Sequence, residues 1–502
     1  MSSTRRWAVL ATVSAGLLLI SVDMTVLYTA LPTLTADLGA DATEKLWIIN
    51  AYPLVMAGLL LGAGTLGDRV GHKRMYLIGL GLFGCASLLA AFAPSPAVLI
   101  AARAFLAVGA AAMMPATLSL IRTTFEDERE RGIAIGVWGS VAMGGAALGP
   151  VVGGLLLGRF WWGSVFLINV PVVIGAVIAT VLVAPGGSGR SDKPWDPVAS
   201  AQVMVGLVGV VYAIKEVTQP EFSVTAVALS LVAAVGGFWM FVRRQRGQEY
   251  PLIDFELLRD PRILTGVVAA GLAMFATAGI QLVLTQRLQL VLELTPLHAG
   301  LLVAAFAAGS LPAGILGGGL LHRVGVRPMI SGGLLLAAAG VALVLPFTGS
   351  GHNWLIPGLV VTGLGLGAAM VAASVAIVGN APAHRAGMAA SVEEVSYELG
   401  SLTGVAVLGS VLTAVYTSTV TLPAGAPEAA GSGMDAALAE AARLPADEGA
   451  ALVAAANSAF DNGYILTLVI ATVTLAVGAA FAHLRLRGHR PTPDAETAAH
   501  GH

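Results

Sequence analysis

The sequence predicts an all-α protein that crosses a membrane many times. Mean hydropathy is +0.83, and only 11% of the residues are charged, against roughly a quarter in a soluble domain. Windows of ~20 apolar residues, the length a helix needs to cross the hydrocarbon core of a bilayer, can be placed fourteen times. The apolar runs are continuous rather than alternating, which favours helices over the strands of a barrel.

The fourteen expected spans follow one another with short polar connections. They begin near Trp7, Trp47, Met75, Ala97, Gly132, Gly163, Pro197, Phe222, Leu264, Leu297, Met329, Trp354, Ala386 and Gly463.

A short polar segment occurs twice in the chain. Residues 64–75 (GTLGDRVGHKRM) return 254 residues later as residues 318–329 (GGLLHRVGVRPM), with six of twelve positions identical. Both copies lie between apolar spans, so each is expected to be a hinge between two membrane helices. A repeated hinge implies a repeated bundle, which is the architecture of transporters built from parallel repeats.

The repeat divides the chain into two six-helix bundles, residues 1–184 and 263–486, separated by residues 185–262 with two inserted spans. The largest polar segment, residues 417–461, lies between the last two spans. We interpret it as a solvated loop whose Ala-rich middle could form a short helix. Residues 487–502 are expected to be a disordered tail.

Positive charge is distributed unevenly between the two sides of the expected membrane. Of the 27 Lys and Arg residues, 21 fall on the side of the N-terminus, five on the other side and one, Arg103, within a span. Loops rich in Lys and Arg stay in the cytoplasm, so both termini are expected there. Only four of the 27 are Lys, and this bias, with the abundant Ala and Gly, suggests a high-GC bacterial genome, so the expected membrane is a bacterial plasma membrane. We expect a monomer.

Sequence patterns typical of other classes of protein are absent or lie in the wrong structural context. Cys85 is the only cysteine, so no disulfide can form within the chain. Residues 79–84 match GxGxxG, but they lie in mid-span with no strand before them and indicate helix packing. The nine histidines show no metal-ligand spacing, and no basic tract suits a phosphate backbone. We therefore expect no enzyme, no metal, no cofactor and no nucleic-acid partner.

A few ionisable residues lie within the apolar spans. They are Asp23, Arg103, Glu393, Glu394 and Glu398. A charge inside hydrocarbon is costly, so a functional role is the default hypothesis. The alternative is that some of them form structural ion pairs or lie at the membrane interface.

The spacing of the three glutamates is informative. Glu394 and Glu398 are four residues apart and share a helix face, whereas Glu393 points about 100° away. Two carboxylates on one buried face repel each other and are poorly solvated, so at least one is expected to hold a proton near neutral pH. Such a group can exchange its proton for a cation.

Asp23 and Arg103 are expected to form a pair. Asp23 lies fifteen residues into the first span, roughly 22 Å from the N-terminal side at 1.5 Å per residue. Arg103 lies seventeen residues from the same side in the fourth span, or roughly 25 Å by the same rise. The two charges therefore share a depth within one bundle, and an unpaired guanidinium there would be costly.

Two segments are expected to control conformation. The fifth span reads WGSVAMGGAALGPVVGGLL, and small residues at intervals of four allow close helix approach while proline bends the helix; generic helix packing is the alternative. In the first hinge, Asp68 is expected to cap a helix end among basic residues and to latch one conformation, more strongly than His322 in the second copy. The residues concerned are Gly64, Asp68, Arg69, Gly71, Arg74, Gly145, Gly149, Pro150 and Gly153.

These segments together resemble one family. The first hinge resembles the helix 2–3 loop signature of the major facilitator superfamily, Arg103 with Gly109 resembles its helix 4 signature, and GAALGPVVGG resembles its antiporter motif. DMTVLYTALP, LWIINAY, FLINVP and SVEEVSYELG are similar to segments of the fourteen-helix drug:proton antiporter branch, especially quaternary-ammonium and dye efflux pumps. The resemblance covers residues 5–485 approximately.

The resemblance implies the major facilitator fold and proton-driven export of lipophilic, mainly cationic compounds, with the five intramembrane charges coupling transport to protons. Aromatic faces attract cations, so the expected substrate-binding residues are Trp47, Asn50, Tyr52, Trp138, Glu393 and Tyr397. Relatives that handle divalent cations often carry an acid at the position of Asn50, so the resemblance favours monovalent substrates. The alternatives are an exporter of a self-made natural product or another specific solute, and a membrane receptor or scaffold that does not transport.

Overall fold

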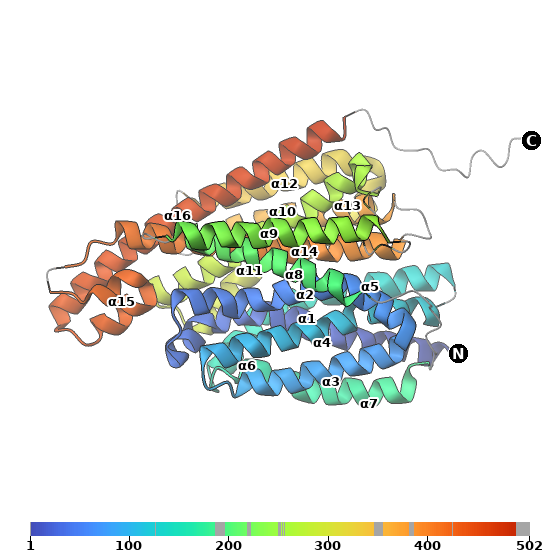
Figure 1. Cartoon of the computed structure of the whole chain (residues 1–502), viewed down its shortest axis with the longest axis horizontal. Helices are drawn as coiled ribbons and strands as arrows, with labels where there is room; N and C mark the ends of the chain where they lie inside the picture. The colour runs from blue at the N-terminus through green and yellow to red at the C-terminus, as the bar shows by residue number, and fades with distance from the viewer. Residues whose placement is uncertain are drawn as a thin grey trace, which may run out of the picture.

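The structure is a bundle of long, roughly parallel and antiparallel helices (Figure 1). This computed structural model describes residues 2–125, 127–185, 196–217, 222–248, 251, 253, 255, 257–345, 355–380, 386–423 and 425–487. The start of α1 and the end of α16 lie at one end of the molecule, here called the terminal end (Figure 1). The opposite end carries α15 and is called the α15 end.

Seven helical segments are found in the described part of the N-terminal bundle. They are α1 (Ser3–Leu38), α2 (Ala42–Val70), α3 (His72–Ala91), α4 (Pro96–Thr124), α5 (Glu128–Leu157), α6 (Ser164–Leu167) and α7 (Asn169–Val183). Two inserted helices follow, α8 (Pro197–Val217) and α9 (Val224–Arg246).

The C-terminal bundle follows a short 3-10 helix, Leu257–Arg259. Its helices are α10 (Pro261–Gln286), which continues as the π-helical turn η2 (Arg287–Val291), α11 (Pro296–Val324), α12 (Val326–Val344), α13 (Leu355–Val378), α14 (Ala386–Thr419), η6 (Glu428–Ser432), α15 (Met434–Ala441) and α16 (Ala446–Arg485).

Twelve of the described helices are long and apolar enough to cross a membrane. Helices α2 and α5 have 29 and 30 residues, or about 45 Å each, and bring the long helices in the described part of the chain to the fourteen predicted. The described residues contain no strand. The predicted all-α polytopic fold is confirmed, and the chain is a multi-pass membrane protein.

The two copies of the repeated hinge have the same backbone conformation. Gly71 lies between α2 and α3 with φ +98°, and Gly325 lies between α11 and α12 with φ +86°. Each glycine donates a backbone hydrogen bond to the carbonyl four residues earlier, at 2.9 and 2.8 Å. Positive φ is accessible to glycine at little cost and to other residues rarely, which explains why both copies retain it. The side chains of Asp68 and His322 lie outside the described residues.

The buried side chains form two apolar cores, one in each bundle. Helix α14 belongs to both, because Leu402, Val405 and Ala406 pack into the core of the N-terminal bundle, whereas Leu408 and Leu412 pack into that of the C-terminal bundle. The face of α14 toward α2 is therefore a seam between the bundles. Charged side chains on that face would meet the N-terminal bundle.

The polar segment between the last two spans is largely helical. Helix α14 runs to Thr419, and α16 begins at Ala446, so the last span is one 40-residue helix that starts well before Gly463. The apolar side chains of Ala430, Met434 and Leu452 are buried. The interpretation of residues 417–461 as a solvated loop is wrong, because Ala-rich sequence favours helix and its apolar side chains cover one another. The short Ala-rich helix is present as α15.

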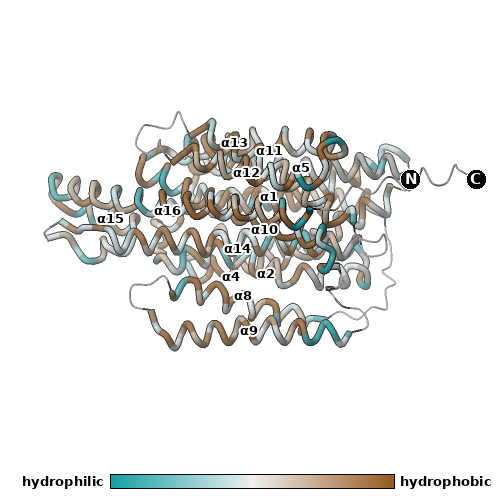
Figure 2. The backbone as a smooth tube through the Cα atoms, turned by 90° about the horizontal axis from the view of Figure 1, so that it is seen from above, coloured by the Kyte–Doolittle hydropathy of each residue, from teal (hydrophilic) through white to brown (hydrophobic). Residues whose placement is uncertain are grey.

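The inserted helices α8 and α9 lie at one edge of the bundle (Figure 2). Helix α8 packs so closely on α2 that a Cβ on Gly58 would lie 3.2 Å from Met204 Sδ. Helix α9 exposes Val224, Leu229 and Val232, each at least 65% accessible, as expected of a helix whose outer face meets lipid. The insertion is therefore attached to the bundle through α8.

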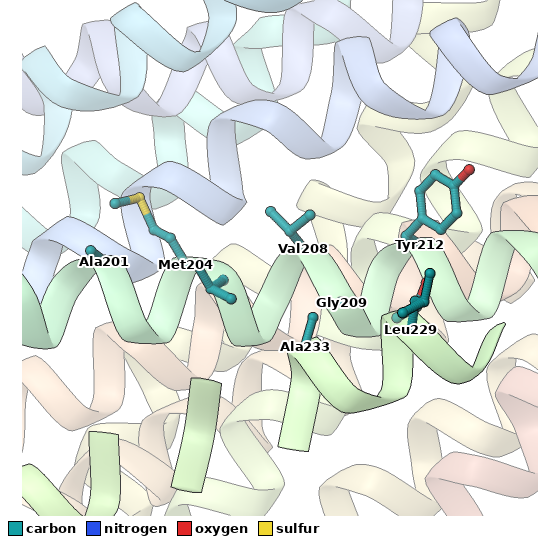
Figure 3. A pocket seen from close by; sticks show the side chains of 9 residues that line it. Ala201, Met204, Val208, Gly209, Tyr212, Leu229 and Ala233 are labelled. Atoms are coloured by element: carbon teal, nitrogen blue, oxygen red, sulfur yellow. The ribbon is translucent and has the colours of Figure 1, made fainter. Parts of the chain in front are cut away.

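A groove of about 500 Å³ runs between α8 and α9 (Figure 3). Its lining is almost wholly hydrocarbon, from Ala201, Met204, Val205, Val208, Gly209, Tyr212, Leu229, Ser230 and Ala233. The Ser230 hydroxyl is already bonded to the Ala226 carbonyl at 2.6 Å. The groove offers no charge to hold a cation and is not the candidate site.

An ion pair ties the two inserted helices together at the terminal end. Arg244 Nε and Gln248 Nε2 donate hydrogen bonds of 2.7 and 2.6 Å to Asp196 Oδ2. Burial alone would raise the pKa of Asp196, but these bonds, one from the Ala199 amide and the charge of Arg244 together lower it. Asp196 therefore stays ionised at neutral pH and fixes the start of α8 against the end of α9.

Candidate functional site

The most deeply buried ion pair described in the molecule joins α1 to α4. Arg103 Nη1 donates a hydrogen bond of 2.5 Å to Asp23 Oδ2. The Asp23 side chain is fully buried and that of Arg103 is 2% exposed. The predicted pairing is confirmed, because the fixed rise of the helix gives both residues the same depth. Its role in coupling stays a prediction.

Neutral polar groups complete the surroundings of this pair. Asn169 Nδ2, at the start of α7, donates to Asp23 Oδ1 at 3.1 Å and to Ser87 Oγ at 3.2 Å. Arg103 Nε donates to the Ile48 carbonyl at 3.4 Å, and the guanidinium lies 4.7 Å from the centre of the Tyr52 ring. Asn169 and Ser87 were missed by the sequence analysis. The available signal was an asparagine inside the apolar FLINVP segment.

Glu398 reaches this pair from the other bundle. Its side chain is buried on α14 and interacts electrostatically with Arg103. Beside it, the hydroxyls of Tyr28 on α1 and Ser401 on α14 are hydrogen bonded across the seam. Glu398 Oε2 has no hydrogen-bond partner among the described residues. The structure thus gathers two carboxylates and one guanidinium around the seam.

The other two glutamates of α14 lie apart from Arg103. Glu393 accepts a hydrogen bond of 2.5 Å from the Tyr397 hydroxyl and another from Ser374 on α13. Glu394 lies between the two sites and interacts with both Glu393 and Glu398. The acids therefore form a row along α14, with one end at Arg103 and the other end at Tyr397.

The expected substrate-binding residues are distributed over several places. Trp47 and Asn50 line a small cavity beside α8, and Tyr52 is buried against Arg103. Trp138 Nε1 donates to Thr117 Oγ1 at 3.1 Å within the N-terminal bundle, while Tyr397 binds Glu393. In this conformation the structure brings Tyr52 close to the charged cluster and places Trp138 elsewhere.

The glycines of the fifth span lie where α5 crosses α1. A Cβ on Gly145 would lie 2.7 Å from Ser21 Cβ, one on Gly149 would lie 2.9 Å from Thr25 Cβ, and one on Gly153 would lie 2.9 Å from Val26 Cγ2. Real Cβ atoms do not approach so closely, so these positions require glycine. The α1 segment that they hold includes Asp23.

The same helix also contacts the other bundle at the α15 end. A Cβ on Gly154 would lie 2.8 Å from the Leu297 amide nitrogen, and one on Gly300 would lie 2.7 Å from the Pro150 carbonyl carbon. At this end Lys45 Nζ and Asp435 Oδ2 are 2.6 Å apart, and Gln289 donates to the Thr29 carbonyl at 2.9 Å. The two bundles are therefore closed against each other at the α15 end.

Other chemistry finds little support in the described residues. No group of three or more His, Cys, Asp or Glu side chains there is placed to hold a metal ion. In the first hinge, Arg69 and Arg74 are exposed, and Gly64 lies beside Pro115 on α4. The charged cluster of Asp23, Arg103 and Glu398 is therefore the candidate functional site, hereafter the seam cluster.

Comparison with known proteins identifies the family. The profile of the Major Facilitator Superfamily matches residues 13–285 and 266–486. The chain is 38% identical over 486 residues to the methyl viologen resistance protein SmvA of Salmonella typhimurium, covering 95% of this chain and 98% of that protein. It is 38% identical over 492 residues to the multidrug efflux pump LfrA of Mycolicibacterium smegmatis, covering 96% and 97%.

A solved structure shows the same fold. A bacterial homologue of the human lysosomal transporter Spinster, in an inward-facing and unoccupied conformation, superposes with a TM-score of 0.69 at 17% identity, covering 97% of this chain and 98% of the other. The repeated hinge, the two bundles, the family profile and the full-length relatives agree. This chain belongs to the Major Facilitator Superfamily of membrane transporters.

Proposed function

We propose that this protein exports lipophilic, mainly cationic compounds across a bacterial plasma membrane in exchange for protons. The observation that carries the proposal is the charge of the seam cluster. When Asp23 and Glu398 are both ionised, a single guanidinium faces two carboxylates. One negative charge is then uncompensated in a low-dielectric environment, which is costly.

Either a proton or a cationic substrate removes that uncompensated charge. A proton on Glu398 neutralises that acid and leaves the neutral pair Asp23–Arg103. A bound cation instead balances the charge of ionised Glu398. The two ligands therefore compete, and competition for one charge is the basis of exchange. Because Asp23 and Arg103 lie in one bundle and Glu398 in the other, occupancy also changes the attraction across the seam.

The row of acids on α14 extends this site. Glu394 and Glu393 continue from Glu398 toward Tyr397, whose ring can face a cation. We infer that Glu394 shares the exchangeable proton with Glu398 and that Glu393, with Tyr397, contacts substrate. Tyr52 and Trp47 are proposed to contact substrate once the seam opens. The protein requires no cofactor, since a membrane potential supplies about 2.3 kcal/mol per proton charge per 100 mV.

The orientation follows from charge. The loops at the terminal end carry most of the Lys and Arg, so this end is proposed to be cytoplasmic. A cysteine placed at Gly71, with the exposed Cys85 replaced by serine, should resist impermeant thiol reagents added to intact cells. The same cysteine should react once the membrane is opened. Ready labelling in intact cells would show that the terminal end faces the outside and would contradict the proposed orientation.

Export is tested in proteoliposomes loaded with buffer at a lower pH than outside, in which inverted copies take up an external lipophilic cation. Two probes are used, tetraphenylphosphonium with one positive charge and methyl viologen with two. Asn50, in place of an acid, favours the monovalent probe, whereas the relative SmvA is named for resistance to the divalent one. Uptake that a protonophore abolishes is expected. Uptake that persists undiminished without a proton gradient would refute proton coupling.

A second candidate is an exporter of one natural product. The chain is 30% identical over 494 residues to the tetracenomycin C resistance and export protein of Streptomyces glaucescens, covering 95% and 91%. Deletion of the gene separates the two proposals. Sensitivity to dyes and quaternary ammonium compounds would favour multidrug export, whereas retention of a single metabolite in the cells would favour the specific exporter.

A further inference from the structure

A small cavity lies where α2, α8 and α14 meet near the α15 end. It measures about 10 Å³, counted as the space open to the centre of a water molecule, and a buried water needs about 10–15 Å³ of occupied volume. The cavity therefore has room for one water. Its lining is Leu46, Trp47 and Asn50 from α2, Val211 and Lys215 from α8, and Ala406 and Ser410 from α14.

Two polar side chains of the lining have unmet hydrogen bonds. Asn50 is fully buried, and neither Nδ2 nor Oδ1 has a partner among the described residues. Ser410 is 2% exposed, and its Oγ also has no partner in that part of the chain. A buried amide without hydrogen bonds is costly and rare. One water between the two side chains would accept a hydrogen bond from Asn50 Nδ2 and donate one to Ser410 Oγ, and would thus satisfy one group of each.

Further unpartnered polar groups continue from the cavity toward the seam cluster. Tyr52 follows Asn50 on α2, is fully buried and has a hydroxyl without a partner among the described residues. It interacts electrostatically with Asp23 and Glu398. Glu398 Oε2 also has no hydrogen-bond partner among the described residues. Ala406 in the cavity lining is eight residues from Glu398, or about 12 Å along α14.

We propose that this cavity binds one water molecule, held by Asn50 and Ser410. This water is the first proton-carrying group on a route that leads from the α15 end to Glu398. The proton part of the inference rests on the proposed function. Lys215 lies in the last turn of α8 and is partly exposed, so the cavity lies near the molecular surface at this end.

This assignment gives the inserted helices a role. Without α8, the face of α2 that carries Asn50 would meet lipid, where an amide and a bound water have no place. Val211 and the stem of Lys215 close that face. The insertion therefore walls the proposed proton route off from the bilayer.

The first test is a structure of the full chain in lipid, resolved well enough to show ordered waters. One peak is expected at about 2.7–3.2 Å from Asn50 and Ser410. A dry cavity, with the Asn50 amide turned to a protein partner, would overturn the site. A peak that disappears in the Asn50→Leu variant would complete the assignment.

The second test compares proton flux driven by tetraphenylphosphonium in proteoliposomes. Asn50→Leu and Ser410→Ala should each slow the flux, the first by at least about tenfold, since loss of a positioned proton-transfer group usually costs more. Binding of tetraphenylphosphonium at equilibrium should be unchanged in Ser410→Ala, because Ser410 holds the water and is not among the expected substrate contacts. Asn50→Ser, which places a hydroxyl where the amide was, should recover part of the rate.

A matched control is Ser230→Ala on α9. That serine is bonded within its own helix and borders the apolar groove, so the flux should not change. Wild-type flux in Asn50→Leu would overturn the proton route even if the water is present. If the wild-type protein showed no flux at all, both the proposed function and the proton route would fail. The water peak would still test whether the cavity binds water. Should Asn50→Leu not fold, Ser410→Ala decides.

Discussion

Each bundle contains an arginine that pairs with an aspartate and lies over a tyrosine ring. In the N-terminal bundle, Arg103 is 2.5 Å from Asp23 and 4.7 Å from the Tyr52 ring centre. In the C-terminal bundle, Arg287 is 2.7 Å from Asp461 and 5.0 Å from the Tyr464 ring centre. The chemistry is the same in both places.

The two pairs differ in burial and in charge. The side chains of Asp23 and Arg103 are 0% and 2% exposed, whereas those of Asp461 and Arg287 are 33% and 10% exposed. Asp461 can therefore be hydrated when its partner leaves. A third charge, Glu398, also faces Arg103. We infer that burial and an additional acid, rather than the pair itself, distinguish a switch from a structural tie.

The largest expected effect comes from removing the two arginines in turn. Arg103→Ala should abolish proton-driven export and destabilise the protein by about 3–5 kcal/mol, because it leaves a buried charge unpaired. Arg287→Ala should cost less than Arg103→Ala and keep export, because Asp461 is 33% exposed and can be hydrated when the arginine is removed. Thermal unfolding in detergent and uptake of tetraphenylphosphonium measure the two effects. Equal damage from both variants would show that burial is not the deciding difference.

A double-mutant cycle sharpens the same comparison. Asp23→Asn with Arg103→Ala should be little worse than either change alone, because both remove one interaction. Additive losses would mean that the two residues act separately.

The next effect concerns the additional acid. Glu394→Gln combined with Glu398→Gln should remove substrate-driven proton flux while the protein stays folded, since a neutral amide cannot exchange a proton. Asp461→Asn on α16, in the same bundle as the two glutamates, is the matched control and should retain flux. Glu393→Gln should alter substrate affinity more than flux, because Glu393 lies at the Tyr397 end of the row. A double variant that still moves protons would remove α14 from the coupling mechanism.

A smaller effect is expected where α5 supports α1. Gly149→Val should cost about 1–3 kcal/mol by overpacking, because its side chain would collide with Thr25 and displace the segment that carries Asp23. Gly144→Val is the control, since a Cβ there has no described neighbour within 4 Å. Export rates and thermal midpoints of the two variants should differ. Indistinguishable variants would show that the α1–α5 contact yields easily.

An effect of similar size is expected when the two hinges are compared. Gly71→Ala and Gly325→Ala should each cost about 1–3 kcal/mol, because both positions have positive φ that other residues adopt only under strain. If Asp68 latches the first hinge, Asp68→Asn should reduce export far more than His322→Asn. Equal losses from these two substitutions would mean that the hinges are alike in energy as well as in backbone.

The sequence was sufficient to predict the helices, the hinges and the Asp23–Arg103 contact. Helical rise is nearly constant, so residue counts translate into depth, and two opposite charges at one depth in one bundle tend to pair. Asn169 was not predicted because a neutral amide gives a weaker signal within an apolar run. Its contact with Asp23 depends on how α7 packs beside α1, which residue counts do not determine.

The contact between Glu398 and the N-terminal bundle was also beyond the sequence. It depends on how the two bundles face each other, and hydropathy is the same for any such arrangement. The segment around α15 was misread because its Gly and Pro residues resemble those of a loop. Burial of Met434 and Leu452 against neighbouring residues becomes visible only when the helices are assembled.

In the proposed mechanism, the seam cluster binds either a proton or a cation. The most direct measurement is proton release from purified protein in weakly buffered detergent solution when tetraphenylphosphonium is added. Wild-type protein should release protons in proportion to bound cation, and the Glu394→Gln, Glu398→Gln double variant should release none. Binding of the cation without proton release in the wild type, or unchanged release in the double variant, would contradict the claim.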